Sequence, residues 1–156
     1  MQQVRLAYHR GMTTSTRALS LPDSVHDFLD ANRFITIATI DPDGSPHQAV
    51  LWYRLDGDEI VLNSAVGRRW PANLQRDPRI SLSVTDEADG YRWVGVTGEA
   101  RAVADQATAQ ADIAEMARRY HADDPGKAER LIRNQFERQQ RISFRVVPIT
   151  VHDHLE

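Results

Sequence analysis

The sequence predicts a mainly β protein in which about six antiparallel strands close into a small barrel with flanking helices. Runs rich in β-branched residues occupy 34–40, 47–55 and 59–63, and such residues pack well on a pleated surface. Tight-turn sequences separate the runs, Asp-Pro-Asp-Gly at 41–44 and Asp-Gly-Asp at 56–58, so an antiparallel meander is expected. Because a sheet of six twisted strands rarely stays flat, closure into a barrel is the economical architecture.

Three further strands are predicted in the second half of the chain. Residues 79–85 alternate strictly between polar and apolar side chains, which is typical of a strand with one buried face. Residues 91–103 form a longer run that contains Gly95 and Gly98. Glycine inside a strand indicates a bulge or the close approach of another group. Alternate apolar positions in 142–146 predict the last strand.

The helices are predicted from apolar residues that recur every three or four positions. The first helix starts with Asp23 or Ser24 as its N-cap. Another covers 105–120 with Asp105 as a plausible cap, and a polar helix follows at 128–140. The apolar stripe of the helix at 105–120 is interpreted as core packing rather than as a cofactor contact. It consists of Ala109, Ile113, Met116, Ala117 and Tyr120.

Length and composition limit the number of domains and exclude several classes of function. A chain of 156 residues suits a single domain, expected at 21–156 after a flexible N-terminal lead-in at 1–20. The net charge of −3 and the absence of long single-sign blocks argue against nucleic-acid binding. No apolar run is long enough to span a membrane, so a cytoplasmic protein is expected. The lack of cysteine excludes disulfides, thiolate metal ligands and cysteine nucleophiles.

Residues 63–78 have the features of an anion-binding segment. A strand ends there in small polar residues, and a glycine and two adjacent arginines precede a short helix. Ser64 can donate a hydroxyl hydrogen bond, and Gly67 allows close approach of the backbone. Arg68 and Arg69 can fork onto phosphate or carboxylate oxygens. Taken alone, the segment is explained equally well as a solvated loop and a basic helix start.

The side-chain sets of conventional enzymes are missing from the sequence. No Gly-x-Ser-x-Gly elbow, Walker loop or Rossmann glycine pattern occurs. The His-Asp-His sequence at 152–154 is interpreted as a frayed polar tail rather than a metal site, because no third ligand accompanies it. Anion-binding arginines without an acid–base pair indicate that a bound cofactor supplies the reactive group.

An ordered set of short motifs resembles the pyridoxamine 5′-phosphate oxidase-like split β-barrel family. Within it, the chain most resembles the branch of reductases that use the deazaflavin coenzyme F420. The resemblance covers residues 21–152, and its specificity lies in the order of the motifs rather than in any one of them. The motifs are Asp43-Gly44-Ser45-Pro46-His47, Asp56-Gly57-Asp58, Gly67-Arg68-Arg69, Asn73-Leu74, Arg76-Asp77-Pro78-Arg79 and Gly98-Glu99-Ala100.

The resemblance implies a six-stranded antiparallel split β-barrel, FMN-binding-like, that forms a homodimer with two cofactor sites in grooves between the subunits. Many relatives have a lysine where this chain has Trp70, so an indole replaces one cationic phosphate contact. By resemblance, the strand at 48–52 lies along the cofactor ring, with Gln48, Ala49 and Val50 as its contacts, and the phosphate-bearing tail is bound by Asn63, Ser64, Arg68, Arg69, Trp70 and Asn73.

The implied function is hydride transfer between coenzyme F420 and a small conjugated organic acceptor. Such a cofactor carries the reactive group itself, which agrees with the missing acid–base pair. Two alternatives stay open at this point: an FMN-dependent oxidase or flavin reductase of the same fold, and a flavin- or deazaflavin-binding protein without catalysis. The expected partners are a small-molecule substrate and a second copy of the chain, with neither nucleic acid nor membrane.

Overall fold

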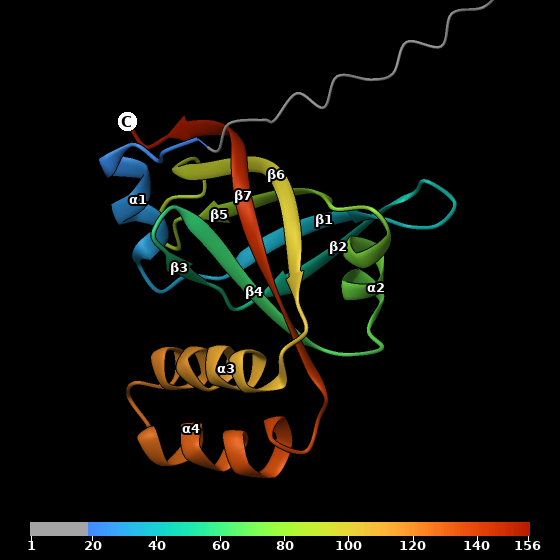
Figure 1. Ribbon diagram of the computed structural model, residues 1–156. Coiled ribbons are helices and arrows are strands. Elements are labelled where there is room, and N and C mark those ends of the chain that lie inside the picture. The colour runs from blue at the N-terminus through green and yellow to red at the C-terminus, as the bar shows by residue number, and fades with distance from the viewer. Residues whose placement is uncertain (1–18) are drawn as a thin grey trace, which may run out of the picture.

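A computed structural model describes residues 19–156, so most of the predicted lead-in lies outside the described residues (Figure 1). The strands form one sheet in the order β2-β1-β5-β6-β7-β4-β3, with every neighbouring pair antiparallel. The predicted mainly β, antiparallel fold is confirmed. The strands are β1 (Ile35–Ile40), β2 (Pro46–Leu51), β3 (Arg54–Asp56), β4 (Glu59–Ala65), β5 (Arg79–Thr85), β6 (Trp93–Val103) and β7 (Arg141–His154).

The sheet has seven strands and its ladder does not close, which corrects the expected six-stranded closed barrel. The difference arises because the predicted strand at 47–55 divides into β2 and β3 at Trp52 and Tyr53. β2 pairs with β1 at one edge of the sheet, and β3 pairs with β4 at the other edge. Consecutive Cα atoms are about 3.8 Å apart, so these two strands lie within about 11 Å of each other along the chain. The sheet must therefore curl until its edges meet at this connection.

The curled sheet encloses the main hydrophobic cluster. Leu82 of β5, Phe144 of β7 and the alternate apolar residues of β1 are buried in it. In 79–85 the apolar side chains are buried and the polar ones are mostly exposed, as predicted. The inward face of the sheet thus follows directly from the period-2 pattern.

Helix α1 (Asp23–Asp30) covers one end of the curled sheet (Figure 1). It buries Val25, Phe28 and Leu29 against the main cluster. Pro22 occupies its N-cap position and no side chain caps the first turn, so the predicted capping role of Asp23 or Ser24 is wrong.

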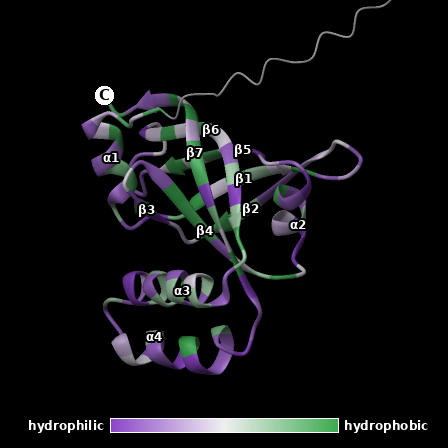
Figure 2. Ribbon diagram, in the orientation of Figure 1, coloured by the Kyte–Doolittle hydropathy of each residue, from purple (hydrophilic) through white to green (hydrophobic). Residues whose placement is uncertain are grey.

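At the other end, α3 (Gln106–Tyr120) packs beside α4 (Pro125–Leu131) and the π-helix η1 (Ile132–Phe136) (Figure 1). The Asp105 carboxylate accepts a hydrogen bond from the Thr108 N–H, which confirms the predicted cap. The predicted core packing of the stripe is confirmed in part: Ile113, Met116 and Ala117 pack with η1 and Val61 of β4 in a second hydrophobic cluster, but Ile113 and Met116 also line a groove described below. Hydrophilic residues predominate on α4 (Figure 2). Among residues 19–156, no helix is long and apolar enough to cross a membrane.

Strand β7 is longer than predicted and pairs with β6 to its end. The His-Asp-His sequence at 152–154 belongs to this strand, so its interpretation as a frayed tail is wrong. His154 stacks on Trp93 with 4.3 Å between ring centroids. A Cβ atom at Gly98 would clash with the backbone carbonyl of Val147 on β7, and the register shifts between Thr97 and Gly98. The predicted close approach and bulge are thereby confirmed.

Candidate functional site

The segment 63–78 connects the end of β4 to α2 (Arg69–Arg76) through a turn at Gly67. Gly67 has a φ of +92°, a conformation that L side chains rarely adopt, so the turn requires glycine. Arg68 stands at the N-cap position of α2 with extended backbone, and Arg69 is the first helical residue. The change of backbone direction between them sends the two side chains into different pockets, which share no lining residue.

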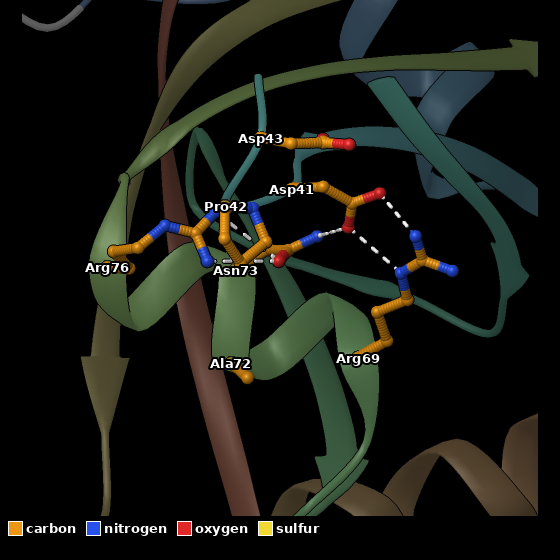
Figure 3. A pocket seen from close by; sticks show the side chains of 7 residues that line it. All are labelled: Asp41, Pro42, Asp43, Arg69, Ala72, Asn73 and Arg76. Atoms are coloured by element: carbon orange, nitrogen blue, oxygen red, sulfur yellow. Dashed lines mark hydrogen bonds and ion pairs between the residues drawn. The ribbon is translucent and has the colours of Figure 1, made fainter. Parts of the chain in front are cut away.

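The Arg69 side chain lies in a surface pocket of about 490 Å³, the Asp41 pocket (Figure 3). Its Nε donates to Asp41 Oδ1 at 2.9 Å, and its Nη2 donates to Asp41 Oδ2. Asn73 Nδ2 donates to the same carboxylate at 2.9 Å. These hydrogen bonds, first that of Arg69 and then that of Asn73, lower the pKa of Asp41 to about 2. The pocket is lined by Asp41, Pro42, Asp43, Arg69, Ala72, Asn73 and Arg76.

The Asp41 pocket fastens α2 to the turn that follows β1. Arg76 donates to the Ile40 carbonyl and to Asn73 Oδ1, while Asn73 Nδ2 also donates to the Thr39 hydroxyl at 3.1 Å. Since Arg69 already holds a carboxylate in a two-point contact, its charge is compensated within the chain.

The Arg68 side chain lines a separate groove of about 280 Å³, the arginine groove. The groove lies between the end of β2, β4 and the helices α3 and η1. One part is apolar and aromatic, and the other is polar and cationic. The apolar lining consists of Phe34, Val50, Leu51, Trp52, Ile113, Met116 and Phe136; the polar lining consists of Asn63, Arg68, Gln135 and Arg141.

Arg141 is the most deeply buried basic residue of this site, with 5% of its surface exposed. Its Nε and Nη2 donate to Asn63 Oδ1 at 3.0 and 2.7 Å, and its Nη1 donates to Gln139 Oε1 at 2.6 Å. All of these acceptors are neutral amides. Burial, reinforced by the nearby charge of Arg68, lowers the pKa of Arg141 to about 10, so the guanidinium remains charged at neutral pH.

No carboxylate compensates this pair of arginines. Within residues 19–156, neither Arg68 nor Arg141 forms an ion pair. The buried carboxylate of Asp112 instead accepts from Arg54 Nη2 at 2.6 Å and from Ser143 Oγ at 2.6 Å. The groove therefore has a cationic end without a counter-ion, formed by the buried Arg141 and the exposed Arg68.

The Asn63 amide is oriented by its neighbours. Its Nδ2 donates to the Ala109 carbonyl at 2.8 Å and to Ser143 Oγ at 2.9 Å. This leaves Oδ1 to accept from Arg141. Asn63 thus fixes the position of the guanidinium, and all of its polar atoms are used inside the protein.

Trp52 forms a rigid part of the aromatic wall. Its ring stacks on Tyr120 with 5.1 Å between centroids and 15° between planes, and Phe136 meets it edge-on. The Tyr120 hydroxyl accepts from the Tyr53 N–H at 3.2 Å and donates to the Arg33 carbonyl. Tyr120 thereby satisfies backbone groups where the β2–β3 connection interrupts the ladder, and it holds Trp52 at the groove.

The structure brings together only some of the residues predicted to bind a cofactor. Val50, Asn63 and Arg68 line the arginine groove, whereas Arg69 and Asn73 belong to the Asp41 pocket. Gln48 lines a third pocket with Trp93 and His152 on the outer face of the sheet.

Three other predicted residues point into the protein interior or lie against it. Ala49 packs against the main cluster. Trp70 is buried there with its ring 5.5 Å from that of Phe144. Ser64 is buried on the face of β4 opposite to Asn63, and its Oγ has no hydrogen-bond partner among the described residues. A cofactor role for these residues stays a prediction.

Sequence reasoning missed Arg141 and Phe136, and it placed Trp52 in the strand along the ring without assigning it a contact. The available signal for Arg141 was alternation, since 141, 143 and 145 are polar while 142, 144 and 146 are apolar. That pattern does not reveal that Asn63 pairs with Ser143 across the β4–β7 ladder. The pairing brings Arg141 to the groove, so the sheet topology was needed to find it.

Comparisons with known proteins agree with this fold. The sequence model for the pyridoxamine 5′-phosphate oxidase family matches residues 21–153. A solved F420 reductase is similar to the chain with a TM-score of 0.67 and 22% identity, covering 85% of this chain and 98% of that one. A conserved hypothetical protein from Mycobacterium tuberculosis has a TM-score of 0.68 and 27% identity, with 90% and 91% covered.

A protein with a different described role has a similar fold. The heme storage protein HutZ from Vibrio cholerae is 18% identical with a TM-score of 0.65, covering 86% of this chain and 95% of that one. No curated protein sequence matches the chain. The fold alone therefore does not choose between an enzyme and a binding protein.

Proposed function

Since this chain belongs to the pyridoxamine 5′-phosphate oxidase family, we propose that it is an oxidoreductase that transfers a hydride between coenzyme F420 and a small conjugated acceptor. The similarity to a solved F420 reductase supports a cofactor of the flavin or deazaflavin kind. The cytoplasm is the proposed location.

The observation that carries the proposal is the division of the arginine groove into an aromatic part and an uncompensated cationic part. A flavin or deazaflavin has the matching shape, a flat conjugated ring with an anionic tail. Trp52 and Val50 would hold the ring, and Arg68 would bind the tail through charge-assisted hydrogen bonds. The groove residues therefore fit this class of cofactor.

When bound, the cofactor supplies the hydride chemistry. The chain's own residues bind and orient it and keep water from the ring. No lining residue of the groove is an Asp, Glu, His, Lys, Cys or Tyr, so none of them is suited to general acid–base work near neutral pH. This agrees with a site whose protein part performs binding rather than proton transfer.

The remaining predicted residues take supporting positions in the proposal. Arg69 and Asn73 hold α2 through Asp41 and so place Arg68. Ala49 of β2 and Trp70 of α2 pack against the main hydrophobic cluster. Gln48 lies on the outer face of the sheet, where a second subunit would meet it.

We also propose that the protein is a homodimer. Phe34 and Val50 line the groove, yet 55% and 66% of their surfaces are exposed. A second copy that covers these side chains would bury apolar surface and narrow the mouth of the groove. Sedimentation equilibrium tests this, because a mass of one chain at micromolar concentration would contradict it.

Fluorescence titrations with F420 and with FMN, made separately, test the choice of cofactor. We expect F420 to bind and reduced F420 to be oxidised when a panel of conjugated acceptors is added. If FMN binds and F420 does not, the FMN-dependent alternative replaces the proposal. Tight binding of F420 without oxidation by any acceptor would favour a cofactor-binding protein, and binding of neither would contradict all three functions.

A further inference from the structure

Arg141 differs from every other strongly buried arginine of the described chain. The side chains of Arg33, Arg54 and Arg145 are 18%, 12% and 15% exposed, and each pairs with a carboxylate. Arg141 is buried more deeply, its guanidinium donates hydrogen bonds only to amide oxygens, and its Cζ lies 5.1 Å from the centroid of the Phe136 ring. A charged group removed from water normally needs a counter-ion. Arg141 lacks the carboxylate partner that the other buried arginines have.

The hydrogen bonds of Arg141 leave a defined part of the guanidinium unused. The group has five N–H donors. One on each nitrogen is directed to Asn63 or Gln139. One N–H therefore remains on Nη1 and one on Nη2 without a hydrogen-bond partner among the described residues, and each can donate to an anion.

The surroundings of Arg141 favour an anion over a protein carboxylate as the missing partner. Arg68 lines the same groove and repels Arg141 rather than compensating it. No side chain caps the first turn of α2, which begins one residue after Arg68. Two guanidinium groups therefore face the same space, and the nearby carboxylate of Asp112 is already bound to Arg54 and Ser143.

We infer that Arg141 is the anion receptor of the arginine groove and makes the groove selective for aromatic ligands that carry a phosphate or carboxylate. The inference deepens the proposed function, because it concerns the same groove, but it does not require turnover. Arg69, although adjacent to Arg68, is excluded from this role by its contact with Asp41. Arg141 is a specificity-determining residue, and Asn63 positions it.

FMN and riboflavin form a suitable pair of probes, because they share one ring and differ by a phosphate. Titrations followed by flavin fluorescence are made with the full chain, with Arg141→Gln and with Arg145→Gln. Arg145 lies on the same strand but pairs with Asp56, so its replacement is the matched control. We expect the wild type and Arg145→Gln to prefer FMN by about tenfold or more, and Arg141→Gln to show a clearly smaller preference, because Arg68 is the only arginine left in its groove among the described residues.

Thermal unfolding gives a second readout that depends on neither flavin nor F420. At equal ionic strength, inorganic phosphate in place of chloride should raise the midpoint of the wild type and of Arg145→Gln by about 2–4 °C. The midpoint of Arg141→Gln should rise by less than that of the wild type, because only Arg68 remains of the arginines that line the described groove. Without phosphate, Arg141→Gln should be at least as stable as the wild type, because an uncompensated buried charge has been removed.

The outcomes separate this inference from the proposed function. An equal phosphate response in all three proteins, or no FMN preference and no phosphate response in the wild type, overturns the inference. A large loss of stability in Arg141→Gln with the FMN preference retained overturns it too, since Arg141 would then be structural. If Arg141→Gln does not fold, Arg141→Lys keeps the charge but loses the fork, and we expect it to lower the preference. Phosphate selectivity without turnover would support the inference while contradicting the proposed reductase.

Discussion

The Asp41 pocket and the arginine groove both receive an arginine from the start of α2, but only the pocket supplies a carboxylate. Arg69 is held by Asp41 at two points, whereas Arg68 and Arg141 share a groove without a counter-ion. The same residue type, one position apart in the chain, thus has a compensated charge on one side and an available charge on the other. The difference shows that an arginine marks an anion site only where no carboxylate of the protein already binds it.

Replacing the amide that binds Arg141 with a carboxylate should cause the largest change in cofactor affinity. Asn63→Asp places a carboxylate beside the Arg141 guanidinium, as Asp41 is placed beside Arg69. The new charge competes with the ligand's anion and repels it, so we expect the affinity for the preferred cofactor to fall about 100-fold. Fluorescence titration measures the change. Gln75→Glu adds the same charge at an exposed position of α2 and is the control; an equal loss there would show a long-range charge effect.

The two adjacent arginines provide the next comparison. Arg68→Ala removes a charge-assisted contact to the ligand, so we expect the cofactor affinity to fall about tenfold or more. Arg69→Ala removes the contact to Asp41 and should change the affinity by less than about threefold, while lowering thermal stability. Cofactor titration and thermal unfolding of both variants check this. Equal losses of affinity in the two variants would show that both arginines contact the ligand, as the sequence alone suggested.

The Asp41 pocket should act on stability and its pH dependence more than on binding. Asp41 has a pKa lowered to about 2 from an ordinary value of 3.8. The carboxylate therefore contributes stability that is fully present above pH 3.8 and is lost as the pH falls toward 2. Asp41→Asn should lower the thermal midpoint by several degrees at pH 7, and the gap to the wild type should close near pH 2. Thermal unfolding of both proteins across this pH range measures the gap. A gap that persists at pH 2 would show that the charge of the carboxylate is not responsible for the stability.

Local patterns were sufficient to predict much of the fold. The tight turns at 41–44 and 56–58, the alternation in 79–85 and the cap at Asp105 depend on neighbours along the chain. The division of the strand at Trp52 and Tyr53 was not predictable, since both residues favour strands. Its cause is the curl of the sheet, which needs this connection to pass from one edge to the other.

The candidate site depended more strongly on contacts between distant residues. The turn at Gly67 was located correctly from the sequence, whereas α2 begins at Arg69, which the sequence had placed before the helix. The division of Arg68 from Arg69 was not, because Asp41 lies 28 residues from Arg69. Arg141 lies 78 residues from Asn63 and meets it only through the β4–β7 register. Residue spacing along the chain carries no information about that register.

A crystal structure of the protein with coenzyme F420 tests the central claim most directly. We predict that the phosphate oxygens lie within hydrogen-bonding distance of Arg68 and of the two unused N–H groups of Arg141, with the ring against Trp52. Arg69 should keep its contact with Asp41. A phosphate bound by Arg69 and Arg76 in the Asp41 pocket, with Arg141 still donating hydrogen bonds only to amide oxygens, would contradict the claim.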